Sequence, residues 1–118
     1  MADRAALRHP RHELDDLFGH PVRFSIMALL AAATSAEFSF VRDRVEVTDS
    51  MLSKQVSSLE QAGYVKVDKS FVGKRPRTWL SLTKPGRRTF DRHLNALREI
   101  AEGDVVLAGA RTLARARP

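Results

Sequence analysis

The feature that most constrains the fold is a change of hydrophobic period at Gly63. Before this glycine, apolar residues recur at helical spacing in successive segments. After it, residues 64–71 alternate with a period of two, and residues 78–83 repeat the alternation. A last helical pattern runs from about residue 83 to 103. The sequence therefore predicts three core helices, a strand, a hairpin connection, a second strand and a closing helix, with one short helix in front.

Two helices are predicted at the start of this series. A short one at residues 11–18 is ended by Gly19 and carries the apolar residues Leu14, Leu17 and Phe18. The next begins at Pro21, because proline suits the first turn of a helix. Its apolar residues form one broad stripe: Val22, Ile26, Leu29, Leu30 and Ala33. This stripe predicts a core helix.

Two further helices precede Gly63. Residues 34–37 interrupt the pattern, and Ser39 is predicted to cap a short helix that runs to about Val45. Thr48 is predicted to cap the next helix, residues 48–62, with Asp49 in the first turn, where a negative charge suits the helix dipole. The predicted inward stripe of that helix is Leu52, Val56 and Leu59.

The opposite face of helix 48–62 is small and polar. Its members are Ser50, Lys54, Ser57, Ser58 and Gln61. Serine allows close approach to phosphates and base edges, and lysine donates to a phosphate or to guanine O6 and N7. A polar outer face is also the norm for a surface helix. The position of helix 48–62 directly before a basic hairpin nevertheless favours contact with a nucleic acid.

The predicted hairpin follows directly. Strand 64–71 puts Val65, Val67 and Phe71 on one face, and residues 78–83 form its partner. Residues 72–77 are predicted to be the connection, with Gly73 and Pro76 holding its tip.

Positive charge is concentrated in this hairpin. Residues 66–77 hold one acid, Asp68, and five cations: Lys66, Lys69, Lys74, Arg75 and Arg77. A charged turn can also serve only to solubilise a protein or to protect a strand edge. An α-helix fits the major groove of B-DNA, and a cationic hairpin beside such a helix is typical of a loop that reaches the DNA backbone or the minor groove.

The closing helix is predicted from Thr83 to Gly103, with Pro85 in its first turn. Its apolar stripe is Phe90, Leu94, Leu97 and Ala101. This stripe could pack within one protomer or across a two-fold axis, and both alternatives stay open. Residues 11–103 are expected to form one domain, with a flexible arm at 1–10 and an Ala/Arg-rich tail at 104–118 that is either helical or disordered.

Composition narrows the class of protein. A chain of 118 residues buries one ordinary core. Its net charge of +6 and sequence pI near 10.5 suit a polyanion partner. It has no cysteine, which excludes disulfides and thiolate-bound metals. The longest apolar stretch, residues 26–33, is far shorter than a membrane span, so we expect a cytoplasmic protein without membrane contact.

Three segments together resemble a known family. They are residues 49–65 (DSMLSKQVSSLEQAGYV), 73–78 (GKRPRT) and 82–86 (LTKPG). They resemble winged helix-turn-helix transcription regulators of the MarR/ArsR type, most of all their short single-domain members. The resemblance covers about residues 17–100, and its most specific parts are SSLEQAGYV and LTKPGR. It implies an α+β, mainly α fold, in which a three-helix core carries a two-stranded β-hairpin wing and flanking terminal helices.

The resemblance also implies roles for residues. Helix 48–62 would be the recognition helix and residues 72–77 the wing of a homodimer on a palindromic operator in double-stranded DNA. The predicted DNA-binding residues are Ser50, Lys54, Ser57, Ser58, Gln61, Lys69, Lys74, Arg75 and Arg77. Terminal helices usually dimerise this family, and the matching residues here are Leu14, Leu17, Phe90, Leu94, Leu97 and Ala101.

Other kinds of site find little support. The four histidines are expected to be solvated, and Asp91 and His93 lack the further downstream histidine that the metal-sensing helix of some ArsR-type repressors would need. No cofactor is predicted. No phosphate-binding glycine loop or catalytic Ser/His/Asp arrangement is present, so we expect no enzyme.

The favoured function is therefore sequence-specific transcription regulation, expected as repression. The alternative is a winged-helix module for protein or RNA interaction. Whether a small-molecule effector exists stays open.

Overall fold

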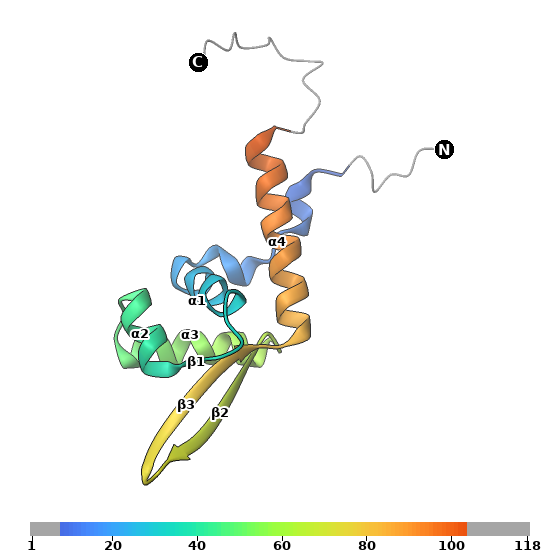
Figure 1. Cartoon of the computed structure of the whole chain (residues 1–118). Helices are drawn as coiled ribbons and strands as arrows, with labels where there is room; N and C mark the ends of the chain where they lie inside the picture. Colours follow the sequence, from blue (N-terminus) through green and yellow to red (C-terminus); the bar gives the residue numbers. More distant parts are fainter. Residues whose placement is uncertain (1–7, 104–118) are drawn as a thin grey trace, which may run out of the picture.

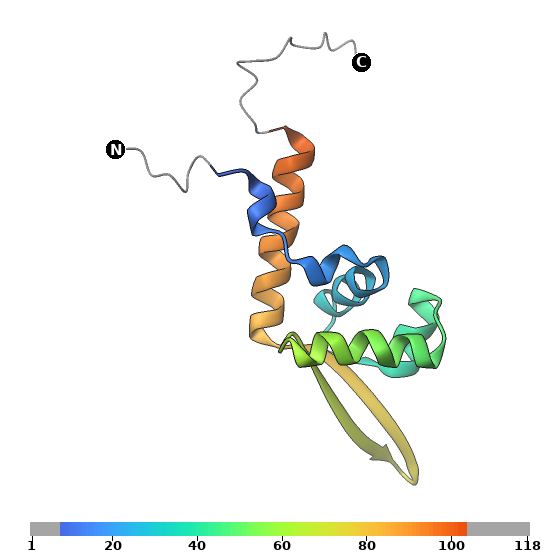
Figure 2. The ribbon, with the colours of Figure 1, turned by 180° about the vertical axis from the view of Figure 1, so that it is seen from behind.

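The computed structural model describes residues 8–103 of the chain. Its helical elements are the 3₁₀ helices η2 (Pro10–Glu13) and η3 (Asp16–Gly19), and the α-helices α1 (Pro21–Ala31), α2 (Phe38–Val45), α3 (Asp49–Gln61) and α4 (Lys84–Glu102). The strands are β1 (Ala36–Glu37), β2 (Val65–Val72) and β3 (Arg75–Leu82). Helices α1 to α3 lie together beside the first half of α4, and the β2–β3 hairpin projects away from them (Figures 1 and 2). We call residues 65–82 the wing.

The core joins every α-helix to the sheet. Its largest fully buried side chains are Phe90, Ile26, Met27, Leu30, Leu52, Leu59, Leu80 and Val41. The predicted inward stripe of α3 is confirmed, as is the burial of Ile26 and Leu30 on α1. The winged-helix fold class, mainly α with an antiparallel hairpin, is also confirmed. Within residues 8–103, no helix is long and apolar enough to cross a membrane.

The predicted short α-helix at residues 11–18 is wrong. Two 3₁₀ turns, η2 and η3, stand in its place. The break falls at Asp15, whose backbone N–H donates to the Nδ1 atom of His93 at 3.0 Å and so is not available to a helical carbonyl. The Asp15 carboxylate also accepts from the Leu17 N–H at 2.9 Å, which starts η3 anew.

The sheet has one strand more than predicted. β1 pairs with β3 through Ala36 with Leu80 and Glu37 with Trp79, which gives the order β1-β3-β2. Residues 36–37 are too few to show a period in the sequence. The helix after them begins at Phe38 without any side-chain cap, so the predicted cap at Ser39 is wrong.

The wing is longer than the sequence predicted. Its strands pair from Val65 with Leu82 to Val72 with Arg75, which leaves only residues 73–74 as the turn. Gly73 has φ of +65°, a left-handed conformation that suits glycine. Pro76 lies inside β3, at a position that β1 does not reach.

Candidate nucleic-acid interface

Helix α3 begins as predicted. The Thr48 hydroxyl oxygen accepts a hydrogen bond from the Met51 N–H at 3.1 Å, and Asp49 lies in the first turn. The Asp49 carboxylate also pairs with the Arg42 guanidinium at 2.9 Å, which ties the start of α3 to α2. Arg42 binds Asp43 as well, and these hydrogen bonds raise the pKa of Arg42 and lower that of Asp43. The turn between the two helices is thus fixed by charged side chains.

The predicted polar face of α3 is largely open to solvent. Ser50, Lys54, Ser57 and Gln61 are exposed. Ser58 is half-buried, and its hydroxyl donates to the carbonyl of Lys54 at 3.4 Å. The structure therefore leaves four of the five predicted α3 residues free to contact a ligand, with Ser58 at the border.

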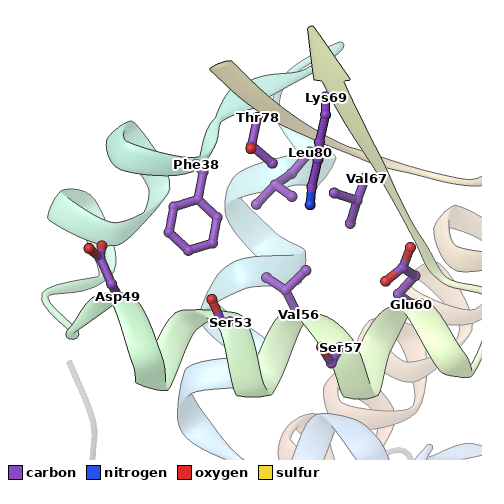
Figure 3. A pocket seen from close by; sticks show the side chains of 10 residues that line it. All are labelled: Phe38, Asp49, Ser53, Val56, Ser57, Glu60, Val67, Lys69, Thr78 and Leu80. Carbon is purple, nitrogen blue, oxygen red and sulfur yellow. The ribbon is translucent and has the colours of Figure 1, made fainter. Parts of the chain in front are cut away.

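A groove of about 720 Å³ separates α3 from the wing (Figure 3). Val56 and Leu80 contribute apolar surface to it, while Ser53, Ser57 and Thr78 line its sides. The exposed Lys69 side chain points from the wing toward α3. Lys69 is among the residues predicted to contact DNA, whereas Ser53 is not, although it lies one turn before Ser57 on the same face of the helix.

Two exposed cations of the wing lie at the end away from the helices. Lys74 and Arg75 are exposed there. Arg77 differs, because it is half-buried and its guanidinium pairs with the Glu37 carboxylate at 2.8 Å. The structure thus brings Arg77 to β1, where its ion pair with Glu37 anchors the wing, rather than to the predicted turn.

A polar contact that the sequence did not indicate holds α3 against α1. Gln55 is only 4% exposed, and its side-chain oxygen accepts from Arg23 at 2.8 Å. Arg23 also donates to the carbonyl of Leu17 at 2.6 Å. Gln55 belongs to neither the apolar stripe nor the outer face, so no periodic signal could have found it.

The predicted dimerisation residues fall into two groups. Phe90 is 1% exposed and belongs to the core of its own protomer, and Leu14, Leu17 and Leu94 are half-buried. Leu97, at 37%, and Ala101 are exposed on the second half of α4. The nearby Ile100, which the sequence analysis did not name, is 36% exposed.

The expectation that all histidines are solvated is wrong for His93. Its side chain is 5% exposed, packs against Phe18 with 5.1 Å between ring centroids, and accepts the Asp15 N–H. Burial lowers the pKa of His93. Asp15 also accepts a hydrogen bond from the Tyr64 hydroxyl at 2.7 Å, so η3, α4 and the end of α3 meet at one polar cluster.

Within residues 8–103, no three His, Asp or Glu side chains are grouped so that they could hold a metal ion. His9 and His20 instead accept hydrogen bonds from backbone N–H groups at the start of η2 and α1.

Comparison with known proteins gives three findings. A family model described as a winged helix DNA-binding domain matches residues 22–101. A protein of Methanocaldococcus jannaschii, described as uncharacterized, is 28% identical over 86 residues, which cover 73% of this chain and 94% of that protein. A solved structure described as a transcriptional regulator homologue from Pyrococcus horikoshii OT3 is 30% identical, has a TM-score of 0.71, and is matched over 78% of this chain and 91% of its own.

A more distant solved structure shares the fold. It is that of ZitR from Lactococcus lactis, described as a zinc-responsive MarR family member. Its TM-score is 0.54 at 15% identity, and the match covers 71% of this chain and 57% of that chain.

Proposed function

The chain belongs to the winged helix DNA-binding domain family and has the winged helix-turn-helix of transcription regulators, and from that premise we propose that it is a repressor that binds a palindromic operator as a homodimer. A compact dimer on a promoter blocks polymerase without needing an activation surface. The ligand of such a protein is genomic DNA, so the proposal includes a cytoplasmic location and a binding rather than a catalytic role. Any small-molecule effector is left open.

One observation carries the proposed mode of binding. The polar face of α3 is exposed, and Ser57 of that face and the exposed Lys69 of the wing both line the groove between the two elements (Figure 3). We assign α3 to the major groove, where Ser50, Lys54, Ser57 and Gln61 would meet base edges and phosphates, with Ser58 at the margin. We assign Lys69, Lys74 and Arg75 to the backbone beside it, and Arg77 to positioning the wing through Glu37.

The second half of α4 supports the proposed dimer. Leu97, Ile100 and Ala101 form an exposed apolar patch there, beyond the residues that pack on the protomer's own core. A two-fold contact on this patch would remove it from water. Leu14, Leu17 and Leu94 are half-buried and are proposed to complete its border.

The test separates base contacts from phosphate contacts. The operator is first selected from a random duplex pool, and binding is then measured by gel shift at several salt concentrations. Arg75→Ala should weaken binding to operator and random duplex alike and reduce the salt slope by about one unit. Lys54→Ala should weaken operator binding by about 1–3 kcal/mol if Lys54 contacts a base, and random duplex less.

Arg88→Ala is the matched control for charge. Arg88 is exposed on α4, on the face turned away from the apolar stripe of that helix. Its loss should leave the salt slope unchanged. If Arg75→Ala leaves affinity and salt slope at the level of the wild type while the fold is intact by circular dichroism, the wing does not bind DNA, and an interaction module for protein or RNA becomes the better explanation.

A further inference from the structure

The end of the wing is apolar as well as cationic. Phe71 is 72% exposed and Val72 is 54% exposed, which are the highest values among the large hydrophobic residues that the structure describes. Phe71 pairs with Pro76 across the hairpin, so the two rings lie on the same face of the ribbon. Both residues lie near the turn of the hairpin at residues 73–74, and this turn is the part of the wing farthest from the helices (Figure 1). An exposed aromatic ring beside cations makes this end of the wing a candidate contact surface.

The register shows which way this face points. Side chains alternate along β2, so Val65, Val67, Lys69 and Phe71 share one face. Val65 is in the core, and Val67 and Lys69 line the groove beside α3. Phe71 therefore continues the side of the wing that faces α3, beyond the end of the groove. A duplex with α3 in its major groove would present the adjacent backbone and minor groove to this face.

The charges around Phe71 favour DNA over a second wing. Lys69, Lys74 and Arg75 are exposed within four residues of Phe71. These cations attract the phosphates that border a minor groove, whereas two wing ends brought together would repel each other.

We propose that Phe71, supported by Pro76, enters the minor groove and disfavours guanine at the position it reaches. The inference rests on the proposed function and adds a residue that determines specificity. Apolar side chains are suited to wedging into a minor groove. There, guanine alone displays an exocyclic amino group, which projects from the groove floor and needs a hydrogen-bond acceptor. A phenyl ring offers no such acceptor, so burial of the amino group beneath it is unfavourable.

The test uses two DNA polymers that share their major-groove groups. Poly(dI-dC) lacks the guanine amino group of poly(dG-dC), and the full chain, bound to a labelled random duplex, is competed with each. Wild-type protein should be displaced by poly(dI-dC) at a concentration lower by on the order of threefold to tenfold. Phe71→Ala should bring this ratio close to one, and Phe71→Leu should give an intermediate ratio. Folding should survive both changes, because the ring is exposed.

Two controls separate this contact from the rest of the interface. Phe40→Ala removes a phenyl ring that is 48% exposed on α2, outside the proposed contacts, and should keep the wild-type ratio. Arg75→Ala should weaken binding to both polymers and lower the salt slope while keeping the ratio. Phe71→Ala should leave the salt slope unchanged, because no ionic contact is lost.

The outcomes distinguish the two proposals. A ratio that Phe71→Ala leaves at the wild-type value, or a wild-type ratio of one with normal salt-dependent binding, overturns the minor-groove role of Phe71 and leaves the proposed function standing. If neither polymer shows salt-dependent binding, both the proposed function and the minor-groove role of Phe71 are overturned. If the wild-type protein forms an oligomer that Phe71→Ala dissociates, the ring contacts a second copy of the chain, and the inference is also overturned.

Discussion

The first turn of α4 lies so close to the backbone of Tyr64, between α3 and β2, that Gly86→Ala should destabilise the protein. Gly86 is buried, and a Cβ atom added there would overlap the carbonyl oxygen of Tyr64 and lie 2.8 Å and 2.9 Å from its carbonyl carbon and Cα. These are backbone atoms, which cannot turn aside as a flexible side chain can. The helix itself would have to move.

The size of the effect follows from three contributions. Alanine is favoured over glycine inside a helix by about 1 kcal/mol. Overpacking typically costs about 1–3 kcal/mol. Moving α4 would also strain the hydrogen bond from the Thr83 N–H to the Tyr64 carbonyl, 3.0 Å long, which is worth about 1 kcal/mol. The free energy of unfolding should therefore fall by roughly 1–3 kcal/mol, or at least about 4 °C in Tm.

Urea unfolding followed by circular dichroism measures this change. Gly19→Ala is the matched control, because an added Cβ at Gly19 meets no atom within 4 Å. That variant should equal the wild type or gain up to about 1 kcal/mol, since alanine reduces the freedom of the unfolded chain. A Gly86→Ala protein as stable as the wild type would contradict this prediction, because it would mean that α4 can shift without cost.

Three further predictions concern other contacts. Burial lowers the pKa of His93 below its unfolded value near 6.5, so the unfolded state binds more protons in acid. The free energy of unfolding, measured with urea, should therefore fall below about pH 6.5, by at most about 1.4 kcal/mol per pH unit. His93→Gln should reduce this pH dependence. Arg23→Ala leaves the buried Gln55 oxygen without its donor and should cost about 1–3 kcal/mol in the same assay. Leu97→Glu puts a charge on the exposed patch of α4 and should shift the proposed dimer to a monomer in sedimentation, with helix content unchanged.

Each of these has a contrary result. An identical pH profile with and without His93 would mean that another group sets the acid limit. A harmless Arg23→Ala would mean that water or a rearranged neighbour satisfies Gln55. A Leu97→Glu protein that stays dimeric would place the two-fold contact elsewhere.

The parts of the fold that could be predicted are those whose signal is local. Thr48 caps α3, α4 starts next to Thr83, and the stripe on α3 is buried, because capping, helix starts and periodic burial depend on residues a few positions apart. The cationic hairpin was visible for the same reason, since its charges are contiguous in the sequence.

The parts that could not be predicted depend on partners far away in the chain. Asp15 and His93 are 78 positions apart, Arg77 and Glu37 are 40 apart, and no hydrophobic period records such pairs. The exposure of Phe71 was missed because alternation marks a face of a strand but not where the core beneath it ends.

The contact at Gly86 also has a geometric consequence for the spacing of operator half-sites. Helix α4 has 19 residues, so at 1.5 Å per residue it is about 28 Å long, and a tilt of about 10° at its base displaces its far end by about 5 Å. In the proposed dimer, that far end holds the two-fold contact, while the base is joined to the end of α3 through Thr83 and Tyr64. A displacement of about 5 Å exceeds the rise of about 3.4 Å between neighbouring base pairs. The spacing of the two half-sites along the duplex would thus depend on a buried glycine that never touches DNA.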